Sequence, residues 1–196
     1  MEKRYKNMKK ALILHGTCGE NEYFSDEYPS LSNSHWFPWL QKQLLMKGIF
    51  TQTPEMPDAY IPDYKKWKNE FERFDVNKDT ILIGHSCGGG FLIRWLSENK
   101  INPKKLILVA PWLDPERRKT KEFFDFNIDK DLSKRTRIDL FISEDDDKEI
   151  LDSVEIIKKN IFGVNIHKFK DKGHFTYKDM RTHEFPELLE VVLIDN

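Results

Sequence analysis

Residues 84–88 read Gly-His-Ser-Cys-Gly, which fits the Gly-x-Ser-x-Gly pattern of a nucleophile elbow. The apolar run 81–83 before it is typical of a strand, and the spacing of the apolar residues in 91–96 predicts a helix. A serine at a sharp turn between a strand and a helix presents its hydroxyl beside the amides of the helix N-terminus. A P-loop is excluded because Gly-Lys-Ser/Thr is absent. We therefore predict that Ser86 is a nucleophile for acyl transfer.

The predicted nucleophile needs a base, because a serine hydroxyl stays protonated at neutral pH and must lie within about 3 Å of a proton acceptor. Six histidines compete for this role: His15, His35, His85, His167, His174 and His183. We select His174, which follows a glycine in the loop after the last predicted strand, where a base should lie over the elbow. The side chain of His85 is expected to be directed away from its neighbour Ser86.

An acid must orient the imidazole and stabilise its charged form. Asp145, Asp146 and Asp147 follow the strand predicted at 137–143, which ends at the same edge of the sheet as Ser86 and His174. At least one of the three aspartates is expected to cap the next helix. We select Asp146 as the acid and keep Asp145 as the alternative.

The developing oxyanion needs two backbone N–H donors. The amide of Cys87, directly after the serine, is expected to be one, and the loop after the first strand to supply the other from Thr17 or Cys18. The Cys87 side chain itself is expected to be a small buried filler rather than a second nucleophile. Aromatic residues near the same edge are the candidates for a substrate pocket: Trp36, Trp112, Phe123 and Phe124.

Strand-like apolar segments alternate with helical patterns along the chain. The segments lie at 11–15, 49–52, 80–84, 105–110, 137–143 and 164–169. This alternation predicts a three-layer sandwich of the α/β-hydrolase type, with a compact, six-stranded, mostly parallel sheet and helices on both faces. The candidate residues all follow strands, and functional sites in such sheets lie at the carboxyl ends of the strands. Their chain order, Ser, Asp, His, is that of α/β-hydrolases.

The length of 196 residues favours one domain over 1–196, with a basic tail at 1–10 and a lid-like insert at 111–136. Lys and Arg total 32 against 33 for Asp and Glu, a balance that gives no indication of a nucleic-acid partner. The apolar run after the tail is too short to span a membrane. Two cysteines without a Cys-x-x-Cys motif indicate neither a disulfide framework nor zinc, and we expect a cytoplasmic location.

Several of these motifs together resemble a known family. They are Gly-His-Ser-Cys-Gly, the aspartate pair 145–146, Lys-Phe-Lys-Asp-Lys-Gly-His-Phe at 168–175 and Trp-Phe-Pro-Trp at 36–39. The chain is similar to the small serine hydrolases that include retinoblastoma-binding protein nine and its bacterial relatives, although its loop 18–34 looks longer. The resemblance implies Ser86, Asp146 and His174 as the triad, and hydrolysis of small esters or amides without metal or cofactor.

Two other functions stay open at this stage. One is a protein-binding module that keeps the fold, which the aromatic residues of the 111–136 insert suggest if they are exposed. The other is a thioesterase or acyltransferase. Both use the same fold, so only the site and its substrates distinguish them.

Overall fold

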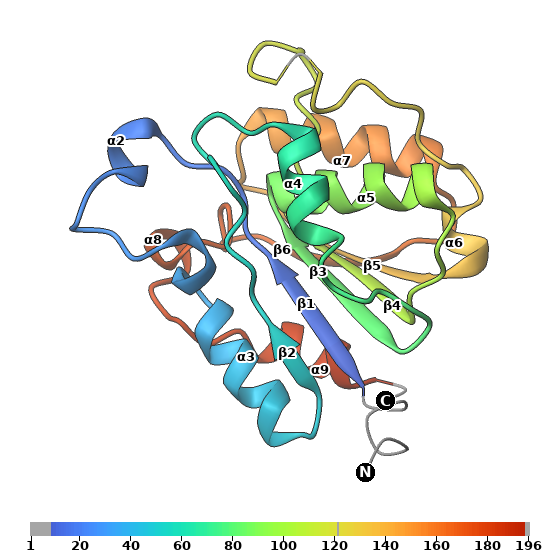
Figure 1. Cartoon of the computed structure of the whole chain (residues 1–196), viewed down its shortest axis with the longest axis horizontal. Helices are drawn as coiled ribbons and strands as arrows, with labels where there is room; N and C mark the ends of the chain where they lie inside the picture. Colours follow the sequence, from blue (N-terminus) through green and yellow to red (C-terminus); the bar gives the residue numbers. More distant parts are fainter. Residues whose placement is uncertain (1–8, 121, 195–196) are drawn as a thin grey trace.

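The architecture is one parallel sheet of six strands, in the order β2-β1-β3-β4-β5-β6 (Figure 1). A computed structural model describes residues 9–120 and 122–194. The strands are β1 (Lys10–Leu14), β2 (Phe50–Gln52), β3 (Thr80–His85), β4 (Lys105–Val109), β5 (Arg137–Ser143) and β6 (Asn165–Phe169). Every neighbouring pair is parallel. The carboxyl ends of all six strands therefore meet at one edge.

Helices cover both faces of the sheet (Figure 1). On one face, α3 (Phe37–Met46) contacts α9 (Pro186–Leu193). The other face carries α4 (Tyr64–Phe71), α5 (Cys87–Asn99) and α7 (Lys148–Asn160). Short helical turns complete the structure: α2 (Glu20–Tyr23), η1 (Leu31–Asn33), α6 (Leu132–Arg135) and α8 (Tyr177–Met180). The predicted three-layer fold is confirmed.

The central strands are the most deeply buried part of the molecule. Every residue of β3 and β4 is buried, because helices pack on both faces of the sheet there. This burial explains why their sequences are continuous apolar runs rather than alternating patterns. The last strand, β6, lies at an edge and has no fully buried residue. The elbow thus follows a strand that is buried along its whole length.

Two predicted segments differ from their expected form. Residues 1–8 of the predicted basic tail lie outside the described residues, and Lys10 already belongs to β1. In the 111–136 insert, Phe123 and Phe124 are only 2% and 7% exposed and belong to the hydrophobic core. The rings of Phe123 and Phe124 are therefore not available for a docking surface on the insert. Within the described residues, no helix is long and apolar enough to cross a bilayer.

Candidate active site

Ser86 occupies a sharp turn between β3 and α5. Its φ of 52° and ψ of −124° lie outside the regions that L-residues normally adopt, so the turn is strained. The turn is held by β4 and the segment after it, since Ser86 N–H donates to Val109 O and Ser86 O accepts from Trp112 N–H, both at 3.0 Å. Gly84 is required by close packing, because a Cβ there would lie 2.6 Å from the Cα of Gly89.

The loop after β1 passes directly over the serine. A Cβ on Gly16 would lie 2.8 Å from Ser86 Cβ, so only glycine allows this approach. Thr17 follows and lines the cavities on both sides of Ser86. In the described part of the chain, the backbone N–H groups of Thr17 and Cys87 have no hydrogen-bond acceptor. Both expected oxyanion donors are therefore unengaged, which is the state that a reacting carbonyl oxygen requires.

Asp146 and His174 form a close pair. Nδ1 of His174 lies 3.0 Å from Oδ1 and 3.2 Å from Oδ2 of Asp146. The Asp146 side chain is 1% exposed, whereas that of His174 is 26% exposed. The N–H of Asp147 also donates to Asp146 Oδ1, at 2.7 Å. A buried carboxylate with fixed partners can hold an imidazole in one orientation while the opposite ring edge faces the cavity.

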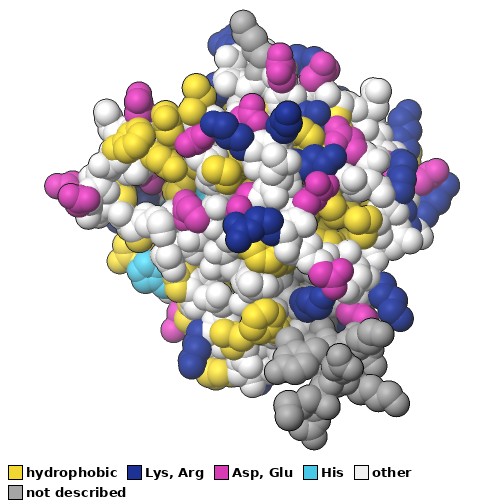
Figure 2. Space-filling model, in the orientation of Figure 1, with side chains coloured by type: hydrophobic (Ala, Val, Ile, Leu, Met, Phe, Trp, Pro, Cys, Tyr) yellow, Lys and Arg dark blue, Asp and Glu magenta, His cyan; other side chains and the backbone are white. Residues whose placement is uncertain are grey.

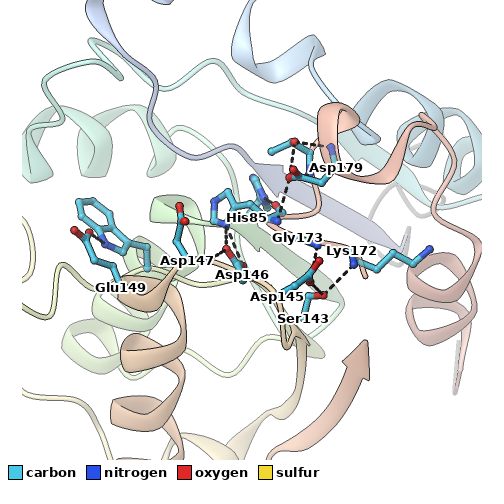
Figure 3. Close-up of polar contacts among 12 residues, drawn as sticks. His85, Ser143, Asp145, Asp146, Asp147, Glu149, Lys172, Gly173 and Asp179 are labelled. Atoms are coloured by element: carbon cyan, nitrogen blue, oxygen red, sulfur yellow. Dashed lines mark hydrogen bonds and ion pairs between the residues drawn. The ribbon is translucent and has the colours of Figure 1, made fainter. Parts of the chain in front are cut away.

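Asp145 has different partners from Asp146 (Figure 3). Its carboxylate accepts from Ser143 Oγ–H and, at 3.0 Å, from the N–H of Gly173. Ser143 Oγ in turn accepts from the N–H of Lys172 at 3.0 Å. These bonds hold Asp145 against the backbone of the loop that carries His174, rather than against the imidazole. The two adjacent aspartates thus contact the same loop in different ways.

Ser86 and His174 line the same two cavities. Among the described residues, no hydrogen bond joins Ser86 Oγ to the His174 ring. Catalytic hydrogen bonds are often long or poorly aligned without substrate and tighten when it binds. The structure therefore brings Ser86, His174 and Asp146 to one rim. Of the two contacts that a triad needs, the one between His174 and Asp146 is formed.

The two cavities lie on either side of these residues. The smaller, about 450 Å³, is lined by Trp112, Lys119, Asp147, Lys148, Glu149 and Ile150 in addition to Thr17, Ser86 and His174. The larger, about 670 Å³, has a wall of aromatic and apolar residues that includes Tyr28, Pro29, Leu31, His35, Phe37 and Tyr177. Both volumes are in the range of small-molecule sites.

The sequence profile of the serine hydrolase family matches residues 27–192. The chain belongs to the serine hydrolase family. It is 28% identical over 106 residues to the hydrolase YdeN of Bacillus subtilis strain 168, a stretch that is 52% of this chain and 50% of YdeN. The match thus spans about half the length of this curated relative.

Solved structures of hydrolases share the fold of this serine hydrolase. The crystal structure of the ydeN gene product from B. subtilis superposes with a TM-score of 0.78 and 22% identity, over 94% of this chain and 96% of the other. The esterase EaEST from Exiguobacterium antarcticum gives a TM-score of 0.59 at 15% identity, over 95% and 91%. These likenesses support the α/β-hydrolase fold, while the closer kinship with retinoblastoma-binding protein nine stays a prediction.

Three of the four aromatic residues expected to line the substrate pocket of this serine hydrolase lie elsewhere. Trp36 is 1% exposed, with its indole N–H bonded to Phe175 O at 3.1 Å. Phe123 packs against Trp67 and Phe91 in the core, and Phe124 packs behind Trp112. The prediction that Trp36, Phe123 and Phe124 line the pocket is therefore wrong. Their rings are placed by packing against the helices and not by their position in the chain after a strand. Trp112 does line the smaller cavity.

The walls of the larger cavity come mainly from segments that connect the strands and longer helices. The loop between β1 and α3 contributes Tyr28, Pro29 and Leu31, and the segment around α8 contributes Tyr177 and His183. Figure 2 shows hydrophobic side chains gathered over α2, where the rings of Tyr23, Phe24 and Tyr60 lie 4.8 to 5.2 Å apart. In the sequence, only the length of the 18–34 loop indicates that it could line a binding site.

Two buried histidines, His15 and His85, and the half-buried His35 lie near the site in the neutral form. Burial lowers the pKa of His85 well below its usual range, and it lowers that of His15 despite the nearby Glu55 carboxylate. Burial, with the charge of His174 next in importance, lowers the pKa of His35 to about 4. Burial also raises the pKa of the Cys87 thiol well above its usual range, which fits an unreactive side chain. Within the described residues, no three His, Cys, Asp or Glu side chains form a metal site.

These histidines predict loss of stability in mild acid. Below pH 6.5 the unfolded chain protonates His15, His35 and His85, while the folded chain holds them neutral, so the unfolded state binds more protons. The free energy of unfolding should thus be highest above pH 6.5 and fall towards pH 4, by up to about 1.4 kcal/mol per pH unit for each group. Urea unfolding at pH 7.5, 5.5 and 4.5 measures this dependence.

His35→Asn supplies the comparison for the acid experiment. Asn does not titrate in this range, and it tolerates the φ of 57° at this position. The variant should lose stability less steeply between pH 6.5 and 4. An unchanged slope in His35→Asn would contradict a neutral His35 in the folded protein.

Proposed function

We propose that this serine hydrolase cleaves esters or amides of small molecules through Ser86, His174 and Asp146. The observation that carries the proposal is the contact of 3.0 Å between His174 Nδ1 and the buried Asp146 carboxylate, beside a strained serine at the end of β3. Family membership supports the reaction class. The coincidence of elbow, base and acid at one rim supports these residues over other candidates.

In the proposed reaction, Ser86 Oγ attacks the carbonyl carbon while Nε2 of His174 takes the hydroxyl proton. Asp146 accepts from Nδ1–H and stabilises the imidazolium. The N–H groups of Thr17 and Cys87 donate to the oxyanion. His174 then returns the proton to the leaving oxygen or nitrogen as the acyl bond breaks. A water molecule, activated by the same imidazole, hydrolyses the acyl-enzyme and restores the serine.

Cavities on both sides of Ser86 suit a substrate with a group on each side of its carbonyl. The larger and more apolar cavity can take the bulkier part, and Trp112 bounds the smaller one.

We propose that the described elements work as one hydrolase domain, with no protein partner needed for turnover. Burial of Phe123 and Phe124 in the 111–136 insert weakens the case for a binding module. A cytoplasmic location remains our prediction from two cysteines, both free thiols in the structure.

A substrate panel tests this proposal. We expect steady turnover of p-nitrophenyl acetate and butyrate by the purified protein, because Ser86 lines both cavities. Aminoacyl amides and acyl-CoA thioesters form the other arms of the panel. Turnover of acyl-CoA alone would assign the protein as a thioesterase, and turnover of no substrate in the panel would argue against a small-molecule hydrolase.

A further inference from the structure

The loop that carries His174 is held through two consecutive carbonyl groups. The carbonyl of His174 lies 2.7 Å from Nε2 of His85, and the carbonyl of Phe175 lies 3.1 Å from Nε1 of Trp36. We refer to His85 and Trp36 as the carbonyl clamp. One member directly precedes Ser86, and the other directly precedes α3. The clamp therefore joins the base loop to the elbow and to the helical layer on one face of the sheet.

Both members of the clamp are rigidly placed donors. Trp36 is 1% exposed and His85 is 3% exposed, and their ring centroids lie 6.1 Å apart in an edge-to-face arrangement. Because a carbonyl oxygen only accepts, Nε2 of His85 must carry its hydrogen. Burial keeps the ring neutral, so this single tautomer persists across the working pH range. Buried bonds of this kind fix geometry more firmly than bonds at the surface.

The clamped peptide also needs this support. Phe175 has a φ of 56°, in the left-handed region that a bulky aromatic residue adopts at a cost, and its side chain is fully buried. The ring of His174 itself has Asp146 as its only hydrogen-bonding side chain among the described residues. The position of its free nitrogen relative to Ser86 is thus set by Asp146 together with the backbone at 174–175.

We propose that His85 and Trp36 are positioning residues that hold His174 in reach of Ser86. The inference rests on the proposed function of Ser86 and His174, and it assigns a role to two residues that touch no reacting atom. A displacement of about 1 Å at a catalytic group can cost about 100-fold in rate. Loss of either clamp bond should therefore lower kcat. Loss of the Trp36 bond should also leave KM nearly unchanged, since Trp36 lines neither cavity beside Ser86, whereas His85 lines the larger one.

The chain offers a matched pair of variants. Trp36→Phe removes one buried indole donor, and Trp67→Phe removes another, whose N–H donates to Pro57 O at 2.9 Å away from His174. Trp67 is as buried as Trp36, so the two variants should lose similar thermal stability. We expect Trp36→Phe to lower kcat by about 10-fold or more at constant KM, and Trp67→Phe to change it less than about twofold. Equal kcat values for the two variants would overturn the clamp.

His85 is tested by rescue. His85→Leu deletes the donor to His174 O, whereas His85→Gln keeps an N–H of similar reach. We expect a fall in kcat of about 100-fold for Leu and recovery of at least a tenth of wild-type kcat for Gln. Equal losses in both variants would count against the clamp. If the Leu variant does not fold, the tryptophan pair decides the question.

Labelling by a fluorophosphonate separates failure of the clamp from failure of the proposed function. Wild type should form an adduct, and Trp36→Phe should form the same adduct at least 10-fold more slowly, because the base is misplaced. A labelled wild type with an equally fast Trp36→Phe variant rejects the clamp alone. An unlabelled wild type rejects the proposed function, and the role of the clamp with it.

Discussion

Ser86→Ala should lower kcat for p-nitrophenyl butyrate by a factor on the order of 10⁴ to 10⁶, with a folded protein of near wild-type stability. The reason is that the hydroxyl forms the acyl-enzyme, and no neighbouring group can replace it. The Cys87 side chain is fully buried with a raised pKa, so it supplies no second nucleophile. Steady-state kinetics with active-site titration of the wild type measure the loss.

Ser97→Ala is the matched control for this result. Ser97 lies on the same helix, α5, and its buried hydroxyl donates to Ile93 O at 2.8 Å. It lines neither cavity beside Ser86. Its removal should change kcat by less than about threefold, since a small loss of stability does not move the catalytic groups. Residual activity in Ser86→Ala within 10-fold of the Ser97→Ala variant would contradict a nucleophilic Ser86.

Asp146→Asn should lower kcat by about 10⁴-fold while leaving KM within a few-fold of wild type. The neutral amide can no longer stabilise the imidazolium, and its NH₂ group favours the wrong tautomer of His174. The shape of the side chain is retained, so the bond from Asp147 N–H can persist. The measurement is kcat and KM on the same ester at pH 7.5.

Asp145→Asn distinguishes the two aspartates. This carboxylate holds Ser143 and the N–H of Gly173 rather than the imidazole, and an amide oxygen can still accept one of those bonds. We expect a loss in kcat of less than about 10-fold. A reversal of the two effects would make Asp145 the acid and would overturn our choice of Asp146.

The strands and longer helices were predictable because the positions that are buried in them are occupied by apolar residues in a regular pattern. β3 and β4 are covered on both faces, so their residues form continuous apolar runs that end at the elbow or at a turn. Of the five longer helices, α7 shows this most plainly, with Ile150, Val154 and Ile157 on its buried face. Because parallel strands end at a common edge, the strand assignment alone predicted that Ser86, the aspartates and His174 lie close together.

Side-chain destinations were less predictable, because they depend on partners far away in the chain. Trp36 follows the loop above the site and was expected in the pocket, but its indole N–H is bonded to Phe175 O, 139 residues away. Asp145 and Asp146 are chemically identical neighbours, and only the position of Ser143 Oγ and the His174 ring separates them. Local patterns in the sequence do not predict contacts between residues that are far apart in the chain.

The most direct test of a nucleophilic Ser86 is peptide mapping of the intact wild-type protein after treatment with a fluorophosphonate. We predict one covalent adduct per chain, on Ser86, and none on protein unfolded in urea before treatment. An adduct on a different residue of the folded protein, or none after prolonged exposure, would contradict it.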